Sequence, residues 1–452
     1  MDMLLTGTGP ADGFPVPGCP CAVCRSVPGG LDSGRFDPGP GGLARTGPGW
    51  SWGSTLGATG RTRAPRRPAE LRLAGRYRVD VHGAVHETEG ETYRLRGGDR
   101  LGRPGIDVRA VGVDGEPVSL LIHPDDERPV LWAPQAGTMS DPALFALMAG
   151  LDGVPLGIAI VGPAPDADPD EPRAGSDPVE AARLIARLRS IGAVDDETAG
   201  LLVGLGHRQG PVDRLDTCLQ HWRVQAPVDG IRLTSRPGPA TPGGRTLVLG
   251  GSASGKSGLA EDLLAAEPDV LYTATGPVVD LRTAPDAEWT ERVRRHRERR
   301  PPWWRTEETH LVAELLWKAE QPVLLDSIGT WLTGVLDRAG AWPDQEGWRE
   351  RVAVETDALV RSWRFRRAPL VAVSDEVGLG VVPATRAGRL FRDELGRLNR
   401  RLTDESDLVL VVVAGRLLAS SSAAPLGFPA SEPGPESARP GPDRNDERRA
   451  GT

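Results

Sequence analysis

The sequence predicts an α/β protein built from two domains, and three observations carry that prediction. Residues 236–244 hold only Arg, Pro, Gly, Ala and Thr, a composition typical of a linker. Beyond them, short apolar runs alternate with helical periods, which predicts a mostly parallel sheet with helices on both faces. Between the first run and the first helix lies a glycine-rich loop of the phosphate-binding type.

The first domain is expected at residues 1–235 and should be rich in strands. Alternating or continuous apolar patterns predict strands at 3–6, 77–81, 118–122, 130–132, 154–161 and 201–207. One helix is expected from Pro178 to about Ile191, because Asp177 can cap it, proline suits its first position and Glu180 lies in its first turn.

The second domain is expected at residues 245–418. Its strands are predicted at 246–249, 269–273, 322–326, 369–374 and 407–413, with helical stretches between them. Residues 419–452 are mostly Ser, Pro, Gly and charged residues with few large apolar groups, so a disordered tail is predicted there.

Composition excludes several classes of function. The net charge of −8, with acids and bases interspersed, argues against a nucleic-acid-binding protein. No apolar run approaches about 20 residues, so no membrane span is expected and a cytoplasmic location is predicted. Three of the four cysteines fall within six positions, a spacing that indicates metal ligands more than disulfides.

The most informative stretch has the pattern G-x-x-x-x-G-K-S after an apolar strand and before an amphipathic helix. Its residues are Gly250, Gly251, Ser252, Ala253, Ser254, Gly255, Lys256 and Ser257. Backbone N–H groups and the helix N-terminus converge here on an anion, Lys256 should reach the outer phosphates, and Ser257 should hold Mg²⁺. The alternative is an ordinary glycine-rich turn. That alternative is disfavoured because the chain has only two lysines, Lys256 and Lys318, so a chance match to a pattern that requires lysine is rare.

Two further residues are candidates for chemistry. Asp326 ends an apolar strand, where a carboxylate can order the water ligands of Mg²⁺; capping the next turn is the alternative. His296 would share a helix face with Trp289 and Val293 and is surrounded by arginines. Packing explains such a histidine, but a neutral imidazole flanked by cations is also suited to attack a nucleotide α-phosphate.

A family resemblance is carried by the phosphate loop and by residues 271–275, 292–306, 324–327, 331–333, 374–383, 386 and 391–399. Through them, residues 245–418 resemble the bifunctional adenosylcobinamide kinase/adenosylcobinamide-phosphate guanylyltransferase family, which implies a RecA-like P-loop fold. Two positions depart from the family pattern, because Asp375 and Gly334 each stand where the family usually has asparagine.

The resemblance implies two reactions in one enzyme of cobalamin biosynthesis. ATP or GTP with Mg²⁺ phosphorylates adenosylcobinamide, and His296 then accepts GMP from GTP and passes it to adenosylcobinamide phosphate, giving adenosylcobinamide-GDP. The resemblance also implies nucleotide binding by Glu376 and a homo-oligomer, because the family forms trimers, unless the added domain blocks that interface. Two rival interpretations stay open: a P-loop small-molecule kinase without nucleotidyl transfer, and a regulatory nucleotide-binding protein.

In the N-terminal domain, Cys19, Cys21 and Cys24 are spaced for one tetrahedral thiolate site. With this motif the domain resembles the phosphodiesterase-like branch of the metallo-β-lactamase fold, which implies an αββα architecture and His207 as the fourth ligand of a structural zinc. Reduced bystander cysteines are the alternative. The H-x-H-x-D-H cluster that hydrolysis needs does not occur in the sequence, so the domain is expected to lack a hydrolytic centre. His82 and His86 are expected to share a strand face and to be exposed to solvent.

Overall fold

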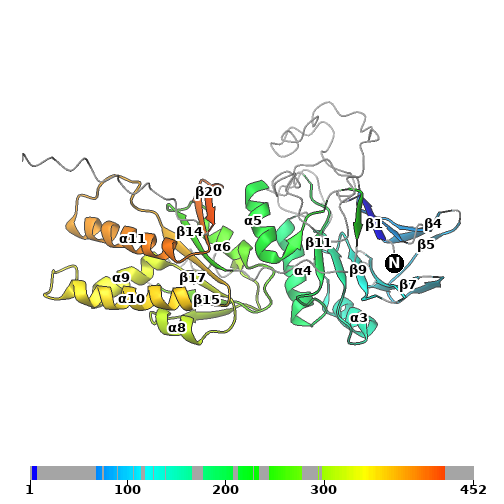
Figure 1. The fold of residues 1–452 in the computed structure, drawn as a ribbon, viewed down its shortest axis with the longest axis horizontal. Helices are drawn as coiled ribbons and strands as arrows, with labels where there is room; N and C mark the ends of the chain where they lie inside the picture. The colour runs from blue at the N-terminus through cyan, green and yellow to red at the C-terminus, as the bar shows by residue number, and fades with distance from the viewer. Residues whose placement is uncertain are drawn as a thin grey trace, which may run out of the picture.

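The computed structural model shows two lobes, the second of which begins at the phosphate-loop strand (Figure 1). It describes residues 3–7, 68–73, 76–88, 90–104, 106–112, 118–125, 127–137, 139–164, 177–206, 212–227, 229–233, 244–276, 294 and 298–422. Cys19, Cys21, Cys24, His207 and His296 therefore lie outside the described residues. Within the described ranges, no helix combines the length and the apolar character that a membrane crossing requires.

The N-terminal lobe contains an antiparallel sheet of six strands. In spatial order these are β13 (Ile231–Leu233), β1 (Met3–Gly7), β2 (Glu70–Leu73), β3 (Tyr77–Val79), β4 (Ala84–Glu87) and β5 (Thr92–Arg94). Buried and less buried residues alternate along β1 and β3, as expected for strands that bury one face.

A second, mixed sheet of seven strands lies beside it. Its order is β12 (Val224–Gln225), β11 (Ala199–Leu202), β10 (Ile158–Val161), β9 (Val130–Ala133), β8 (Ser119–His123), β7 (Ile106–Val111) and β6 (Arg100–Arg103). Strands β9 to β12 pair in parallel and β6 to β9 pair antiparallel. The central strands β9 and β10 are buried along their whole length, which indicates that both faces of this sheet are covered.

Neighbouring residues of these central strands enter two different cores. Trp132, Ile158 and Ile160 join Met3 and Leu5 in the core between the two sheets. Leu131, Ala159 and Val161 point the other way, into a core with the helices α3 (Asp141–Leu151), α4 (Pro178–Ser190) and α5 (Val212–Trp222). In the described residues the lobe is therefore a layer of helices on two packed sheets, which accounts for three of the four layers of the predicted αββα architecture.

The predicted helix and most predicted strands of this lobe are confirmed, with two differences. Helix α4 begins after Asp177, whose Oδ1 accepts a hydrogen bond of 3.0 Å from the Val179 amide. Strand β10 begins at Ile158 and not at residue 154, since Pro155 has no N–H to donate to a sheet. Strand β11 ends at Leu202, and Gly204 beyond it has a positive φ of 73°.

The second lobe contains the predicted parallel sheet. Its order is β16 (Arg305–Glu308), β15 (Leu271–Ala274), β17 (Val323–Asp326), β18 (Leu370–Asp375), β14 (Arg245–Gly250), β19 (Leu408–Val413) and β20 (Arg416–Ser422). Every pair is parallel except β19 with β20. All five predicted strands are present. Two strands were not predicted. Strand β16 has no apolar residue, and β20 extends to Ser422, past the start of the expected tail at residue 419.

Helices cover both faces of this sheet. One helix layer belongs entirely to this lobe, whereas the other combines a helix of this lobe with a helix of the N-terminal lobe. Four helices pack on one face: α8 (Val312–Lys318), α9 (Ile328–Arg338), α10 (Trp348–Phe365) and α11 (Arg386–Asp404). On the other face lies α6 (Lys256–Leu263), which begins directly after the phosphate loop. Helix α5 of the N-terminal lobe packs against α6, as Figure 1 shows at the centre of the molecule.

This junction is a continuous part of the core. One apolar cluster contains Leu219 and Trp222 of α5 together with Leu259 and Leu263 of α6. Polar contacts surround it. The Trp222 indole donates to the carbonyl of Asp262 at 2.7 Å, the Arg214 guanidinium pairs with the Asp262 carboxylate, and Arg189 Nη1 donates to the carbonyl of Ala266 at 2.7 Å.

Replacing Trp222 with alanine should destabilise both lobes together. The side chain is 1% exposed and fills the junction, so its loss should lower the free energy of unfolding by about 3–5 kcal/mol. Urea denaturation followed separately by a probe in each lobe measures this effect. Trp317→Ala is the matched control, because Trp317 is 56% exposed. An unchanged transition of the C-terminal lobe in Trp222→Ala would show that the lobes unfold independently.

Candidate functional site

The phosphate loop joins the end of β14 to the start of α6, and its backbone needs glycine at two points. An added Cβ at Gly250 would lie 2.6 Å from the carbonyl oxygen of Val412, which leaves no room for a side chain. Gly255 has a φ of 94°, a conformation that glycine adopts without strain. Since Gly255 has no side chain to cap α6, the first amides of this helix remain available to an anion.

Two side chains of the loop are prepared for a ligand. The buried Ser254 hydroxyl has no hydrogen-bond partner among the described residues. Lys256 is 5% exposed, and its Nζ lies 3.0 Å from the carbonyl oxygen of Gly251 and 2.8 Å from Asp375 Oδ1. Ser257 follows in the first turn of α6. Glu376 adjoins the loop, because its amide donates to the Gly250 carbonyl at 3.1 Å.

Asp326 ends β17, and Tyr272 on the neighbouring β15 donates a hydrogen bond of 2.8 Å to its Oδ2. Burial, and then the Asp326 carboxylate, raises the pKa of Tyr272 well above its ordinary value, so the phenol stays a donor. Arg300 lies over the Tyr272 ring, with its guanidinium carbon 3.7 Å from the ring centroid. Asp326 is thus oriented by a hydrogen bond from the neighbouring strand β15. Capping of the next turn, the alternative role, does not explain this contact.

Parallel pairing brings these groups to one edge of the sheet. Strands β14, β15, β17 and β18 run in the same direction, so the carboxyl ends of β14, β17 and β18 carry the loop, Asp326 and Asp375 along a common edge. Tyr272, within β15, reaches this edge through its hydrogen bond to Asp326. The Ser257 hydroxyl and the Asp326 carboxylate are hard oxygen donors, which fit Mg²⁺ as its protein ligands while phosphates and waters complete its shell. The arrangement suits binding of a nucleoside triphosphate and phosphoryl transfer from it.

The segment that follows His296 is described from residue 298. It contacts α6, the helix that begins directly after the phosphate loop. Arg299 donates from Nε to Glu261 Oε2 at 3.0 Å, and Glu261 is a buried residue of α6. From the other lobe, Arg183 Nη2 donates to the carbonyl of Arg299 at 3.1 Å. The role of His296 itself stays a prediction.

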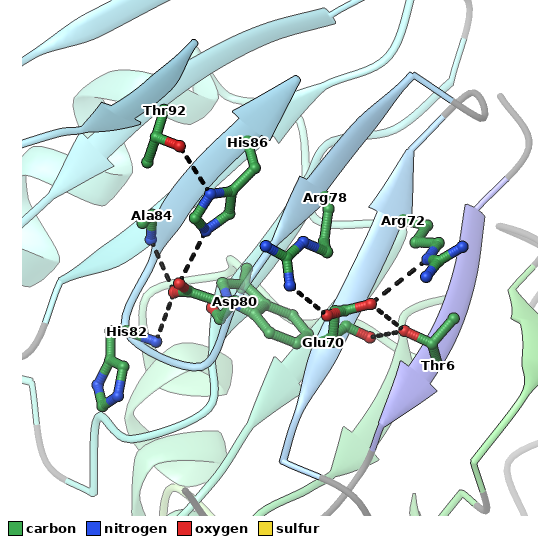
Figure 2. A network of polar contacts seen from close by, with 10 residues as sticks. Thr6, Glu70, Arg72, Arg78, Asp80, His82, Ala84, His86 and Thr92 are labelled. Atoms are coloured by element: carbon green, nitrogen blue, oxygen red, sulfur yellow. Dashed lines mark hydrogen bonds and ion pairs between the residues drawn. The ribbon is translucent and has the colours of Figure 1, made fainter. Parts of the chain in front are cut away.

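In the N-terminal lobe, the expectation of solvent exposure is right for His82 and wrong for His86. His82 is exposed in the turn before β4, whereas His86 is half-buried, with Nε2 3.0 Å from Asp80 Oδ2 and Nδ1 2.9 Å from Thr92 Oγ1 (Figure 2). Burial acts to raise the pKa of Asp80, but hydrogen bonds from His86 and from the Ala84 and His82 amides outweigh it, and the pKa lies below its usual value. His86 therefore links Asp80, at the turn before β4, to Thr92 of β5.

A second group in Figure 2 is centred on Glu70, which accepts hydrogen bonds from Thr6 at 2.8 Å and from Arg78 at 3.0 Å. These contacts tie β1, β2 and β3 together. Among the residues for which the structure gives a placement, no three His, Cys, Asp or Glu side chains are grouped to hold a metal ion. The predicted zinc ligands are not among those residues.

For two residues of the site, Tyr272 and Asp375, the sequence alone predicted no function. Tyr272 is a polar aromatic residue within the short strand β15, and that feature could have marked it as a partner for the acid at the end of β17. Asp375 was noted only as a departure from asparagine, and the structure places it on Lys256. The other departure, Gly334, lies in α9, where an added Cβ would be 3.4 Å from His310 Nδ1.

Comparison with known proteins concerns the second lobe. Residues 246–419 match the family model described as cobinamide kinase / cobinamide phosphate guanyltransferase. The chain is 37% identical over 180 residues to the bifunctional adenosylcobalamin biosynthesis protein CobU of Salmonella typhimurium, an alignment that covers 37% of this chain and 95% of that protein. It is 35% identical over 178 residues to CobU of Escherichia coli K12, covering 37% of this chain and 95% of the relative. It is 38% identical over 177 residues to the bifunctional adenosylcobalamin biosynthesis protein CobP of Pseudomonas aeruginosa, covering 38% and 94%.

Proposed function

The chain belongs to the cobinamide kinase / cobinamide phosphate guanyltransferase family through residues 246–419, and we propose that it is a bifunctional enzyme of cobalamin biosynthesis. It phosphorylates adenosylcobinamide with ATP or GTP and then guanylylates the product with GTP. The observation that carries the proposal is the shared sheet edge, where Lys256 starts α6 and Asp326 ends β17. Substrate identity rests on the family.

The kinase step uses the loop as a cradle for the triphosphate. The first amides of α6 and the Lys256 ammonium hold the phosphate oxygens, while the aminopropanol hydroxyl of adenosylcobinamide attacks the γ-phosphorus. A new P–O bond forms to that hydroxyl oxygen, the bond to the β-phosphate oxygen breaks, and the hydroxyl proton is released. Ser257 and Asp326 would hold Mg²⁺, which supplies charge neutralisation at the phosphates.

The guanylyl step uses His296 as the nucleophile. Its imidazole attacks the α-phosphorus of GTP and expels pyrophosphate, forming a phosphoramidate with GMP. A phosphate oxygen of adenosylcobinamide phosphate then displaces the imidazole, giving adenosylcobinamide-GDP. Support comes from the neighbouring described residues: Arg299 pairs with Glu261 of the loop's own helix, and Arg300 stacks on Tyr272, which holds Asp326.

One pair of assays tests both activities on the full chain. Incubation with α-labelled GTP should leave an acid-labile, base-stable label on the protein, and γ-labelled ATP or GTP should transfer its label to adenosylcobinamide. Transfer to adenosylcobinamide without protein label would favour a small-molecule kinase without nucleotidyl transfer. Nucleotide binding without either reaction would favour a regulatory protein.

For the N-terminal lobe we infer a metallo-β-lactamase-like domain that lacks a hydrolytic centre. Two packed sheets with helices on an outer face support this inference. Cys19, Cys21, Cys24 and His207 would bind one structural zinc. The lobe covers α6 and so contributes to the nucleotide-binding lobe by packing, without chemistry of its own.

Metal analysis of the purified full chain should find about one zinc per chain, the content of a four-ligand structural site. Replacing Cys21 with serine should release that zinc, because a hydroxyl is a poor substitute for a thiolate ligand. Cys218→Ser is the matched control, since Cys218 is buried in the apolar core and burial raises the pKa of its thiol well above the ordinary value. Two metals per chain would contradict the inferred loss of the hydrolytic centre.

A further inference from the structure

Asp375 forms an ion pair with Lys256, the lysine of the phosphate loop. It is the last residue of β18 and lies opposite Gly250 in the register of β18 with β14. Its Oδ1 lies 2.8 Å from Lys256 Nζ. The loop's one ammonium group is therefore neutralised by a carboxylate, on a lysine that is almost fully buried.

The position of this carboxylate is fixed from two sides. Asn399 of α11 donates to the Asp375 carbonyl at 3.0 Å and accepts from the Ser374 hydroxyl at 2.6 Å, which anchors the end of β18. Asp375 Oδ2 faces Gly329 in the first turn of α9, where an added Cβ would lie 3.1 Å from it. A helix N-terminus favours negative charge, so the carboxylate has a stable place next to the lysine.

A triphosphate that enters the loop competes with Asp375 for the same ammonium group. Lysine donates three N–H bonds, and Lys256 already uses one on Gly251 and one on Asp375. The incoming phosphates and the carboxylate carry charge of the same sign and repel each other at this distance. An asparagine at this position, as in the family pattern, would not add that repulsion.

We propose that Asp375 makes this site selective for the complex of a nucleoside triphosphate with a divalent cation over the metal-free nucleotide. The cation's charge offsets the repulsion that the carboxylate imposes on the phosphates, so binding without the cation is penalised. Asp375 is thus a specificity-determining residue of the loop. The inference rests on the proposed function in one respect only, namely that a nucleoside triphosphate binds at the loop.

The test measures affinity and not turnover. The Kd of a fluorescent, non-hydrolysable GTP analogue is determined for the full chain in excess Mg²⁺ and in EDTA. Asp375→Asn should tighten binding in EDTA by at least about tenfold, the size expected when a like-charge contact is removed. Its Kd in Mg²⁺ should change by less than about threefold, so the EDTA/Mg²⁺ ratio of Kd values falls.

Asp269→Asn is the matched control, because it removes the same charge two residues before β15, at the other edge of the sheet from the loop, where Asp269 pairs with Arg305. This variant should keep the wild-type ratio. An equal ratio in Asp375→Asn and the wild type would overturn the inference while leaving the proposed function intact. If the wild-type chain does not bind the analogue even in Mg²⁺, the proposed nucleotide site fails and the inference fails with it. Unchanged melting temperatures establish that both variants are folded.

Discussion

Lys256→Ala is expected to lower both phosphorylation of adenosylcobinamide and guanylylation of the protein by about 10²–10³-fold, the usual effect of removing one preorganised charge-stabilising donor. Both reactions place a triphosphate on the same loop in the proposed mechanism. Lys256 is buried at the start of α6 with its ammonium directed at Gly251 and Asp375, so no other lysine can replace it. Initial rates with γ-labelled ATP and α-labelled GTP measure the two effects.

Lys318→Ala is a stringent control, because Lys318 is the only other lysine in the chain. It is exposed on α8, on the opposite face of the sheet from α6, and pairs with Glu314. Both activities should stay within about twofold of the wild type, as for most surface substitutions. Loss of one activity alone in Lys256→Ala would contradict a single phosphate site for both steps.

His296→Ala is expected to separate the two activities. Removing a covalent nucleophile should lower labelling by α-labelled GTP by at least about 10³-fold. Phosphorylation of adenosylcobinamide should continue, because the loop, Lys256 and Asp326 are untouched. The measurement compares acid-labile protein label with labelled adenosylcobinamide phosphate in the same preparation.

His82→Ala provides the matched histidine control, since His82 is exposed in the other lobe. It should keep full labelling. Retention of label in His296→Ala would assign the nucleophile to a different residue. Parallel loss of label and phosphorylation, with an unchanged melting temperature, would mean that His296 serves the phosphate site and does not carry GMP.

Local sequence was sufficient for the core of the candidate site. The apolar run before Gly250, the glycine at position 255 and Lys256 at the helix start are adjacent in the chain, and the strand, loop and helix they predict are present. The same holds for Asp326 at the end of β17. Short-range periodicity and turn chemistry decide such units before distant parts of the chain meet.

Strands without an apolar pattern were not predictable in this way. Strand β16 reads Arg, Thr, Glu, Glu and is exposed throughout, so it exists because it pairs with β15 at the sheet edge. Strand β20 follows β19 antiparallel and takes four residues from the expected tail. Their hydrogen-bond partners lie in other strands, which no local pattern names.

The sequence by itself therefore determined the phosphate loop, the strand-helix alternation and the position of Asp326 at the end of a strand, because each depends on residues close together in the chain. Only the tertiary structure decided that Asp375 neutralises Lys256, that Tyr272 orients Asp326 and that Trp222 of the first lobe packs on the loop's own helix. These contacts depend on sheet register and on which apolar faces meet. An apolar helix face shows that something covers it, but the choice of partner is made by the whole fold.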